Sequence, residues 1–154
     1  MHRLLLVLLL VVYPSLSHAA DLVVSGAWIR YLPGDIPSAG YFTLANKGSV
    51  GVELTGAESA AFGKVMLHQT VEQNGVAKMV MVRALPIAPG AKLVFRPGGY
   101  HLMLTHPKKT LSIGSKVPIT LNFKDGTRVR VEFEVRSGPF KPTELMSLVG
   151  STNH

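Results

Sequence analysis

Short runs of alternating apolar and polar residues, separated by turn-forming residues, fill the chain from Asp21 to about Arg136. Successive side chains of a strand point to opposite faces, so this alternation is typical of strands that bury one face. No apolar stripe of useful length repeats with the period of a helix. The sequence therefore predicts an all-β domain, and the spacing of its turns suits a sandwich. The expected strands span residues 22–29, 40–45, 51–57, 64–71, 76–82, 92–95, 101–105, 116–123 and 128–135.

Sulfur and imidazole side chains gather in three of these expected strands, between residues 65 and 105. One aliphatic residue separates the two members of each pair, so both members share a face of their strand. The pairs are Met66 with His68, Met79 with Met81, and His101 with Met103. The neighbouring aliphatic residues form the expected buried face, namely Val65, Leu67, Val80, Val82, Leu102 and Leu104. The reverse arrangement would expose these aliphatic side chains, so we expect a surface patch rich in histidine and methionine.

The Asn-Gly dipeptide at positions 74–75 separates the first two of these strands. Between alternating segments it predicts a two-residue β-hairpin of type I′. That turn places His68 directly opposite Met81. Met79 then lies opposite Thr70, on the diagonal from His68 but within reach of a long side chain. Hairpin geometry alone leaves both methionines as candidate ligands.

The third strand follows a Pro-Gly-Gly-Tyr turn at positions 97–100. Glycine adopts backbone conformations that other residues resist, so a tight turn can place His101 at the start of the strand. His101 and Met103 then lie roughly 7 Å apart along one face, close enough to converge on a single ion.

Two imidazoles with thioethers form a selective set of metal ligands. Thioether sulfur is soft and neutral and favours Cu(I), whereas structural zinc prefers thiolate, imidazole or carboxylate. The chain contains no cysteine, which disfavours a blue-copper electron carrier. Each residue alone has an ordinary alternative, because methionine fills gaps in cores and a strand histidine is usually solvated or hydrogen-bonded. Their common phase in three strands favours a shared copper site over a metal-free binding module.

The spacing of these residues resembles that of the PCuAC family of periplasmic copper chaperones. In this chain His68 is followed by ten residues and Met79, then by twenty-one residues and a His-x-Met motif inside PGGYHLML. The resemblance extends from the ADLVVSGAWIR segment to about Arg136. It implies a cupredoxin-like Greek-key β-sandwich.

The resemblance also implies which residues bind Cu(I), and where the copper goes. The implied ligands are His68, Met79, His101 and Met103. Family members often carry further methionines where this chain has Gln69 and Thr70. Met81 and Met66 are therefore candidates for auxiliary sulfur. The implied acceptor is the binuclear copper centre of cytochrome c oxidase subunit II, reached directly or with a Sco-type thiol protein. A periplasmic copper-buffering protein for tolerance, without a dedicated acceptor, is the alternative.

The first nineteen residues have the features of a secretory signal peptide. A short basic start precedes an apolar run over residues 4–13 and a small-x-small ending at Ala19. The run is too short to span a membrane, so we expect no stable membrane insertion. Cleavage after Ala19 or Ala20 would release a periplasmic chain with one domain over residues 20–136. A loosely packed tail is expected over residues 137–154.

Some histidines and methionines lie outside this pattern. His106 departs from the ligand phase and is expected in a loop, whereas Tyr100 is a candidate for shielding the metal site. Met146 and His154 lie in the tail, where we expect incidental roles. A second copper, bound there as Cu(II), is the alternative.

The chain is basic, with a formal charge of +7 that falls to +6 when Arg3 leaves with the signal peptide. Export, scattered basic residues and the lack of aromatic-basic interleaving argue against nucleic acid as a partner. A basic surface is suited to an acidic partner or anionic headgroups, or is simply solvated. The sequence shows no GxSxG or HExxH motif, so we expect a monomeric binding protein and not an enzyme.

Overall fold

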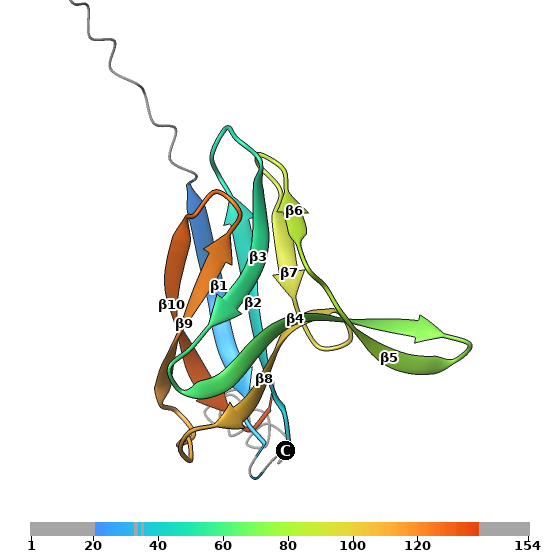
Figure 1. Cartoon of the computed structure of the whole chain (residues 1–154), viewed down its shortest axis with the longest axis vertical. Helices are drawn as coiled ribbons and strands as arrows, with labels where there is room; N and C mark the ends of the chain where they lie inside the picture. The colour runs from blue at the N-terminus through green and yellow to red at the C-terminus, as the bar shows by residue number, and fades with distance from the viewer. Residues whose placement is uncertain (1–20, 33, 35, 139–154) are drawn as a thin grey trace, which may run out of the picture.

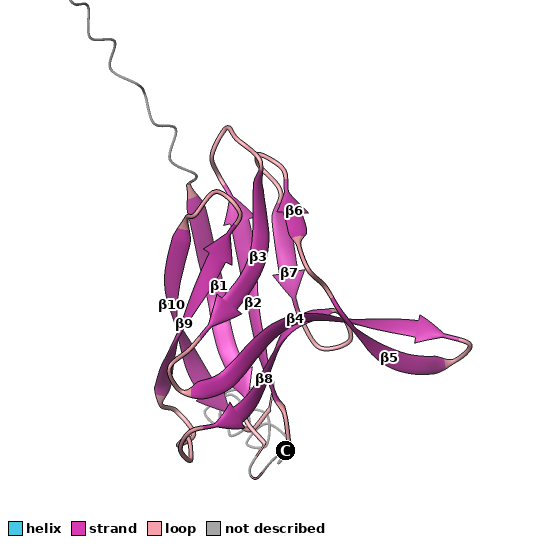
Figure 2. Cartoon of the chain, in the orientation of Figure 1, coloured by secondary structure: helices cyan, strands magenta, loops and turns pink. Residues whose placement is uncertain are grey.

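The computed structural model describes residues 21–32, 34 and 36–138, and every regular element in these ranges is a strand (Figures 1 and 2). The ten strands are β1 (Leu22–Arg30), β2 (Ser38–Asn46), β3 (Val52–Glu58), β4 (Phe62–Gln73), β5 (Val76–Met81), β6 (Leu85–Ile87), β7 (Lys92–Phe95), β8 (Tyr100–Pro107), β9 (Lys116–Phe123) and β10 (Arg128–Arg136). The all-β prediction is confirmed. In this part of the chain no helix has the length and apolarity needed to cross a bilayer. The expected signal peptide, and the tail from residue 139 onward with Met146 and His154, lie outside the described residues.

Hydrogen bonds join the ten strands into one continuous sheet, in the order β5-β4-β8-β7-β2-β1-β10-β9-β3-β6. Most neighbours are antiparallel, whereas β1 runs parallel to β10 and β7 runs parallel to β8. Figure 1 shows the sheet wrapped around itself into a two-layered body, from which the hairpin of β4 and β5 projects sideways. Nine of the ten strands match those expected from the pattern. The missed strand, β6, has three residues with a proline at its centre, too short for alternation to reveal.

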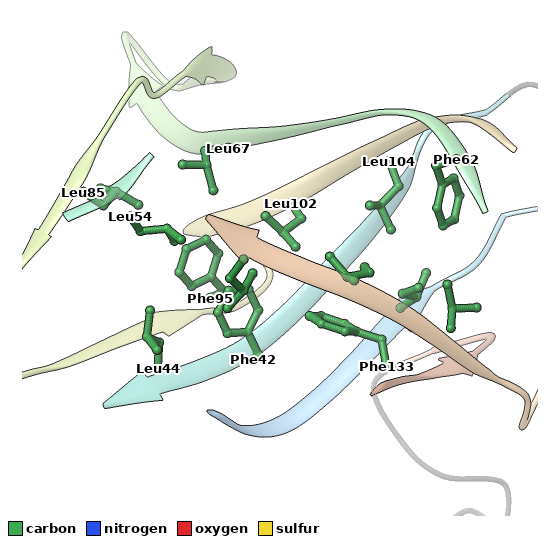
Figure 3. Packing of buried hydrophobic residues seen from close by; sticks show 14 of the residues in the cluster. Phe42, Leu44, Leu54, Phe62, Leu67, Leu85, Phe95, Leu102, Leu104 and Phe133 are labelled. Carbon is green, nitrogen blue, oxygen red and sulfur yellow. The ribbon is translucent and has the colours of Figure 1, made fainter. Parts of the chain in front are cut away.

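The core lies between the two layers, where alternate residues of most strands point inward (Figure 3). In β9 the buried positions follow a strict period of two and are Val117, Ile119, Leu121 and Phe123. Phe42 is the aromatic centre, stacked on Phe95 at 4.1 Å between ring centroids and packed edge-on against Phe133 at 5.6 Å. Phe42 is therefore a core aromatic.

Trp28 is buried, but it does not belong to this core. It packs with Ala39 and Tyr41 in a small separate cluster, and its ring centroid lies 4.8 Å from that of Tyr41. The guanidinium of Arg136 lies 5.6 Å from the Trp28 ring. In β2, residues 40, 42 and 44 point inward, so Ala39 and Tyr41 point to the outer face. Trp28 covers that outer face, which the alternation of β1 alone did not reveal.

The aliphatic face predicted beside the histidines and methionines is confirmed in β4 and β8 but not in β5. Leu67, Leu102 and Leu104 are buried and point into the core (Figure 3). All six residues of β5 are exposed, and Val80 is 41% exposed. The prediction that Val80 is buried was therefore wrong. The hairpin extends beyond the body of the sandwich, where no second layer lies over its valine face.

Candidate metal centre

The predicted hairpin register is confirmed and brings the two histidines together. Asn74 and Gly75 have φ angles of 54° and 74°, as a type I′ turn requires. β4 lies between β5 and β8, and His68 faces Met81 on one side and His101 on the other. The two imidazole centroids lie 5.9 Å apart with their planes at 69°. A metal bound through a ring nitrogen lies about 3 Å from the ring centroid, so both rings can reach one ion.

His101 is held in one orientation by the turn before it. The ring is only 5% exposed, and its Nδ1 lies 3.1 Å from the carbonyl oxygen of Gly99. A carbonyl only accepts, so Nδ1 carries the proton and donates to it. The same carbonyl accepts a hydrogen bond from the backbone N–H of Thr70 at 3.0 Å, which anchors the turn to β4. This arrangement leaves the Nε2 lone pair of neutral His101 free for a metal.

One ring nitrogen of His68 lacks the hydrogen-bond partner that a buried polar atom usually has. Its Nδ1 is buried, and no hydrogen-bond partner for it is present among the described residues. Burial lowers the pKa of His68 below its usual range, and the nearby His101 and Lys64 lower it further. The neutral imidazole is therefore favoured. A buried nitrogen with an unused lone pair is costly unless it is paired, and a metal ion would satisfy it.

The four methionines of the patch divide between two pockets. Met103 and the 64% exposed Met79 line a pocket of about 240 Å³ together with His101 and the segment that leads from β1 into β2. Met66 and the 61% exposed Met81 line another pocket, of about 260 Å³, with Val65, Leu67 and Arg83. His68 lies between the two groups, since its strand neighbours are Met81 and His101. The geometry thus places Met79 and Met103 in one pocket with His101, and Met66 and Met81 in the other. Met66 also faces Met103 directly across β4 and β8.

Carboxylates do not contribute to this cluster. Within residues 21–32, 34 and 36–138, no three histidine, aspartate or glutamate side chains are close enough together to hold an ion. The neighbours of the imidazoles are neutral thioethers, a donor set suited to a soft monovalent ion.

A family model described as putative lipoprotein LpqE-like matches residues 22–135, which contain all of these side chains. The chain belongs to this family. The LpqE-like family is the PCuAC family, so the relationship inferred from the spaced motif is confirmed. The chain is also 35% identical, over 121 residues, to the putative lipoprotein Lxx21020 of Leifsonia xyli. That match covers 78% of this chain and 72% of the relative.

Solved structures of PCuAC domains have the same fold. The Cu(I) form of DR1885 from Deinococcus radiodurans is 32% identical with a TM-score of 0.62, covering 78% of this chain and 79% of that one. The copper-bound PCuAC domain from PmoF2 has a TM-score of 0.63 at 23% identity, covering 76% of this chain and 93% of that domain. The predicted cupredoxin-like architecture is confirmed by this likeness.

Several features of this PCuAC domain escaped the sequence reasoning. Arg30, Ile36 and Pro37, from β1 and the segment after it, line the pocket of His101. No local pattern marks them, because only the pairing of β2 with β8 brings this segment to the site. The Gly99 carbonyl was also missed, although the Gly-Gly turn was a usable signal.

Two neighbours of the site differ from expectation. Tyr100 does not shield the patch, because its side chain packs with the core and lies 6.0 Å from Phe95 between ring centroids. His106 is exposed at the end of β8 rather than in a loop, and its Nδ1 lies 3.1 Å from the hydroxyl of Thr105.

Proposed function

We propose that this protein is a periplasmic Cu(I) metallochaperone whose ligands are His68, Met79, His101 and Met103. The observation that carries the proposal is the adjacent His68–His101 pair, with a buried unpartnered nitrogen on one ring and a free Nε2 on the other. The copper-bound and Cu(I) structures of related PCuAC domains support it. The proposal includes the copper acceptor. The protein delivers Cu(I) to the binuclear copper centre of cytochrome c oxidase subunit II, directly or with a Sco-type protein.

The exposure of the ligands suggests how copper leaves. Met79 is 64% exposed on the projecting hairpin, whereas His101 is almost fully buried. A thiolate of an acceptor can therefore displace Met79 first, with the imidazoles released last. Thioethers are neutral and bind more weakly than thiolates, so the exchange runs towards a thiol-bearing acceptor. Copper remains monovalent throughout, and the transfer requires no electron donor.

Copper retention and delivery test this function together. The purified mature chain is expected to keep one Cu(I) per molecule through gel filtration and to pass it to the soluble domain of cytochrome c oxidase subunit II. Retention without delivery to that domain, and normal oxidase assembly in a deletion strain, would favour the copper-buffering alternative. A chain that retains no stoichiometric Cu(I) refutes the proposal.

Two matched substitutions identify the third ligand. Met79→Ile is expected to weaken Cu(I) binding about tenfold or more, because it removes a thioether beside His101. Met81→Ile, a change of equal size on the same exposed strand, is expected to alter the affinity by less than about threefold. Competition titrations with a Cu(I) chelator measure both. If only Met81→Ile weakens binding, Met81 is the ligand and the choice of Met79 is wrong.

Acid is expected to weaken Cu(I) binding through the histidines, because a protonated imidazole cannot coordinate whereas a thioether does not titrate. Burial and nearby positive charge lower the pKa of His68, so this ring remains neutral further into acid than an ordinary histidine. Affinity should be constant from about pH 8 to about pH 7 and fall at least about tenfold by about pH 5. Chelator competition at each pH measures this, and a flat profile would exclude histidine ligation.

A further inference from the structure

Positively charged side chains surround the histidine and methionine patch. Arg30 lines the pocket of Met79, His101 and Met103. Arg83 is exposed and lines the pocket of Met66 and Met81. Lys64 lies on the same face of β4 as His68, and its charge contributes to the lowered pKa of that histidine. The three cations thus approach the patch from three different segments of the chain.

These cations are not neutralised within the described structure. None of the three takes part in an ion pair there, and the Nε of Arg30 is buried without a hydrogen-bond partner. On β4, Glu72 and Lys64 both lie four residues from His68, about 13 Å along the strand, but only Lys64 contributes to the lowered pKa of His68. Glu134 on β10 already contacts Lys116 at 3.5 Å and Arg136 at 3.3 Å. Asp35, in the segment between β1 and β2, lies outside the described residues. The described surroundings of the patch are therefore cationic.

Copper would make this face more positive still. The proposed ligands are two neutral imidazoles and two neutral thioethers, so a bound Cu(I) keeps its full charge. A carboxylate placed about 7 Å from that ion would gain roughly threefold in affinity at the dielectric of water, and more at the lower effective dielectric of a protein surface. An acidic partner can thus distinguish the loaded protein from the empty one.

We propose that the face formed by Arg30, Lys64, Arg83 and the exposed Met79 and Met81 docks an acidic surface of the copper-accepting protein, and that bound Cu(I) strengthens this docking. The inference rests on the proposed chaperone function and specifies its partner. After transfer the face loses one positive charge, which favours release of the partner. A protein is a better match than a lipid surface because the cations surround the metal site itself, and copper can leave only to a molecule that carries ligands.

Copper transfer to two synthetic peptides tests the charge of the partner. Both carry two cysteines separated by three residues; one is flanked by four glutamates and the other by four glutamines. The wild-type mature chain, loaded with Cu(I), is expected to transfer copper to the glutamate peptide at least about tenfold faster at about 20 mM salt. At about 500 mM salt the two rates should converge, since the interaction is screened. Equal rates at low salt would overturn the inference, whereas loss of Cu(I) retention would overturn the proposed function beneath it.

Neutralising substitutions locate the docking surface. Arg30→Gln combined with Arg83→Gln is expected to reduce the ratio of the two transfer rates at least about threefold. The ratio is the informative quantity, because a variant that merely releases copper more easily changes both rates alike. Arg83→Gln alone, at an exposed position outside the strands, serves if the double variant does not fold.

Lys47→Gln combined with Lys92→Gln is the matched control for net charge. Lys92 pairs with Ala45, six residues along β2 from the Ala39 that faces Met103, or about 20 Å away. Lys47 follows the same end of β2. This control should leave the ratio unchanged. A loss of equal size in both double variants would show that net charge acts without a docking face, and the inference would be wrong.

Two further comparisons complete the test. A glutamate peptide with serines in place of cysteines cannot take copper, and it is expected to bind the Cu(I)-loaded chain about threefold to tenfold more tightly than the empty chain. Equal affinities would disprove the role of the copper charge. Cosedimentation with phosphatidylglycerol vesicles tests whether the face binds a lipid surface instead. Vesicle binding that depends on Arg30 and Arg83, with equal transfer to both peptides, would identify a lipid-binding face and contradict the inference.

Discussion

Replacement of His101 by alanine is expected to lower Cu(I) affinity at least about 100-fold. Loss of an outer partner of a metal-bound histidine typically costs tenfold to 100-fold in affinity, and the ligand itself contributes at least as much. His101 is also the most constrained of the proposed ligands, since its Nδ1 donates to the Gly99 carbonyl and its side chain is nearly inaccessible to solvent. Chelator competition measures the affinity, and thermal unfolding of the metal-free variant shows whether the fold is retained.

His106→Ala provides the matched control for that experiment. His106 lies five residues further along the same strand, but its side chain is exposed. Within the described residues, its ring nitrogens have one hydrogen-bond partner, the Thr105 hydroxyl. Its removal should leave the Cu(I) affinity within about twofold of the wild type. Comparable losses in both variants would mean that β8 contributes a different nitrogen ligand from the one proposed.

Replacement of Phe133 by alanine is expected to lower the free energy of unfolding by about 3–5 kcal/mol. Phe133 is fully buried in β10 and packs edge-on against Phe42, so the substitution leaves a cavity between the two layers. Urea denaturation of the metal-free chain measures the change.

The control for this prediction is Val50→Ala, at a position that is 53% exposed in the connection between β2 and β3. It should change the free energy of unfolding by less than about 0.5 kcal/mol. If Phe133→Ala costs less than about 1 kcal/mol, the packing of β10 onto the rest of the sandwich is not as described here.

The strand register at the candidate metal site followed from local rules that act over a few residues. The Asn-Gly turn at 74–75 fixes the pairing of β4 with β5, and a period of two then fixes which side chains share a face. The same parity placed His101 and Met103 together on β8. These rules are reliable because a shift of one residue would move Leu67 and Leu102 out of the core.

Features that depend on tertiary contacts were beyond the sequence. Val80 alternates like a buried residue, but burial also requires an opposing layer, which the projecting hairpin lacks. Trp28 is buried in a second core cluster, where it packs on the outer face against Tyr41. Arg30 reaches the metal pocket only because β2 lies between β1 and β8. Each of these features depends on a partner that is distant along the chain.

The choice between Met79 and Met81 also depends on both a local rule and a tertiary contact. Hairpin geometry placed Met81 directly opposite His68, and the register confirms it. The three-dimensional structure adds that Met79 shares a pocket with His101 and Met103, whereas Met81 shares one with Met66. The spaced motif of the PCuAC family and the pocket therefore favour the same methionine.

Copper K-edge X-ray absorption of the Cu(I)-loaded mature chain tests most directly whether imidazoles and thioethers from three strands meet at one ion. We predict a first shell of two nitrogen scatterers at about 2.0 Å and two sulfur scatterers at about 2.3 Å. A shell made of sulfur alone, or of nitrogen and oxygen without sulfur, would contradict the site described here.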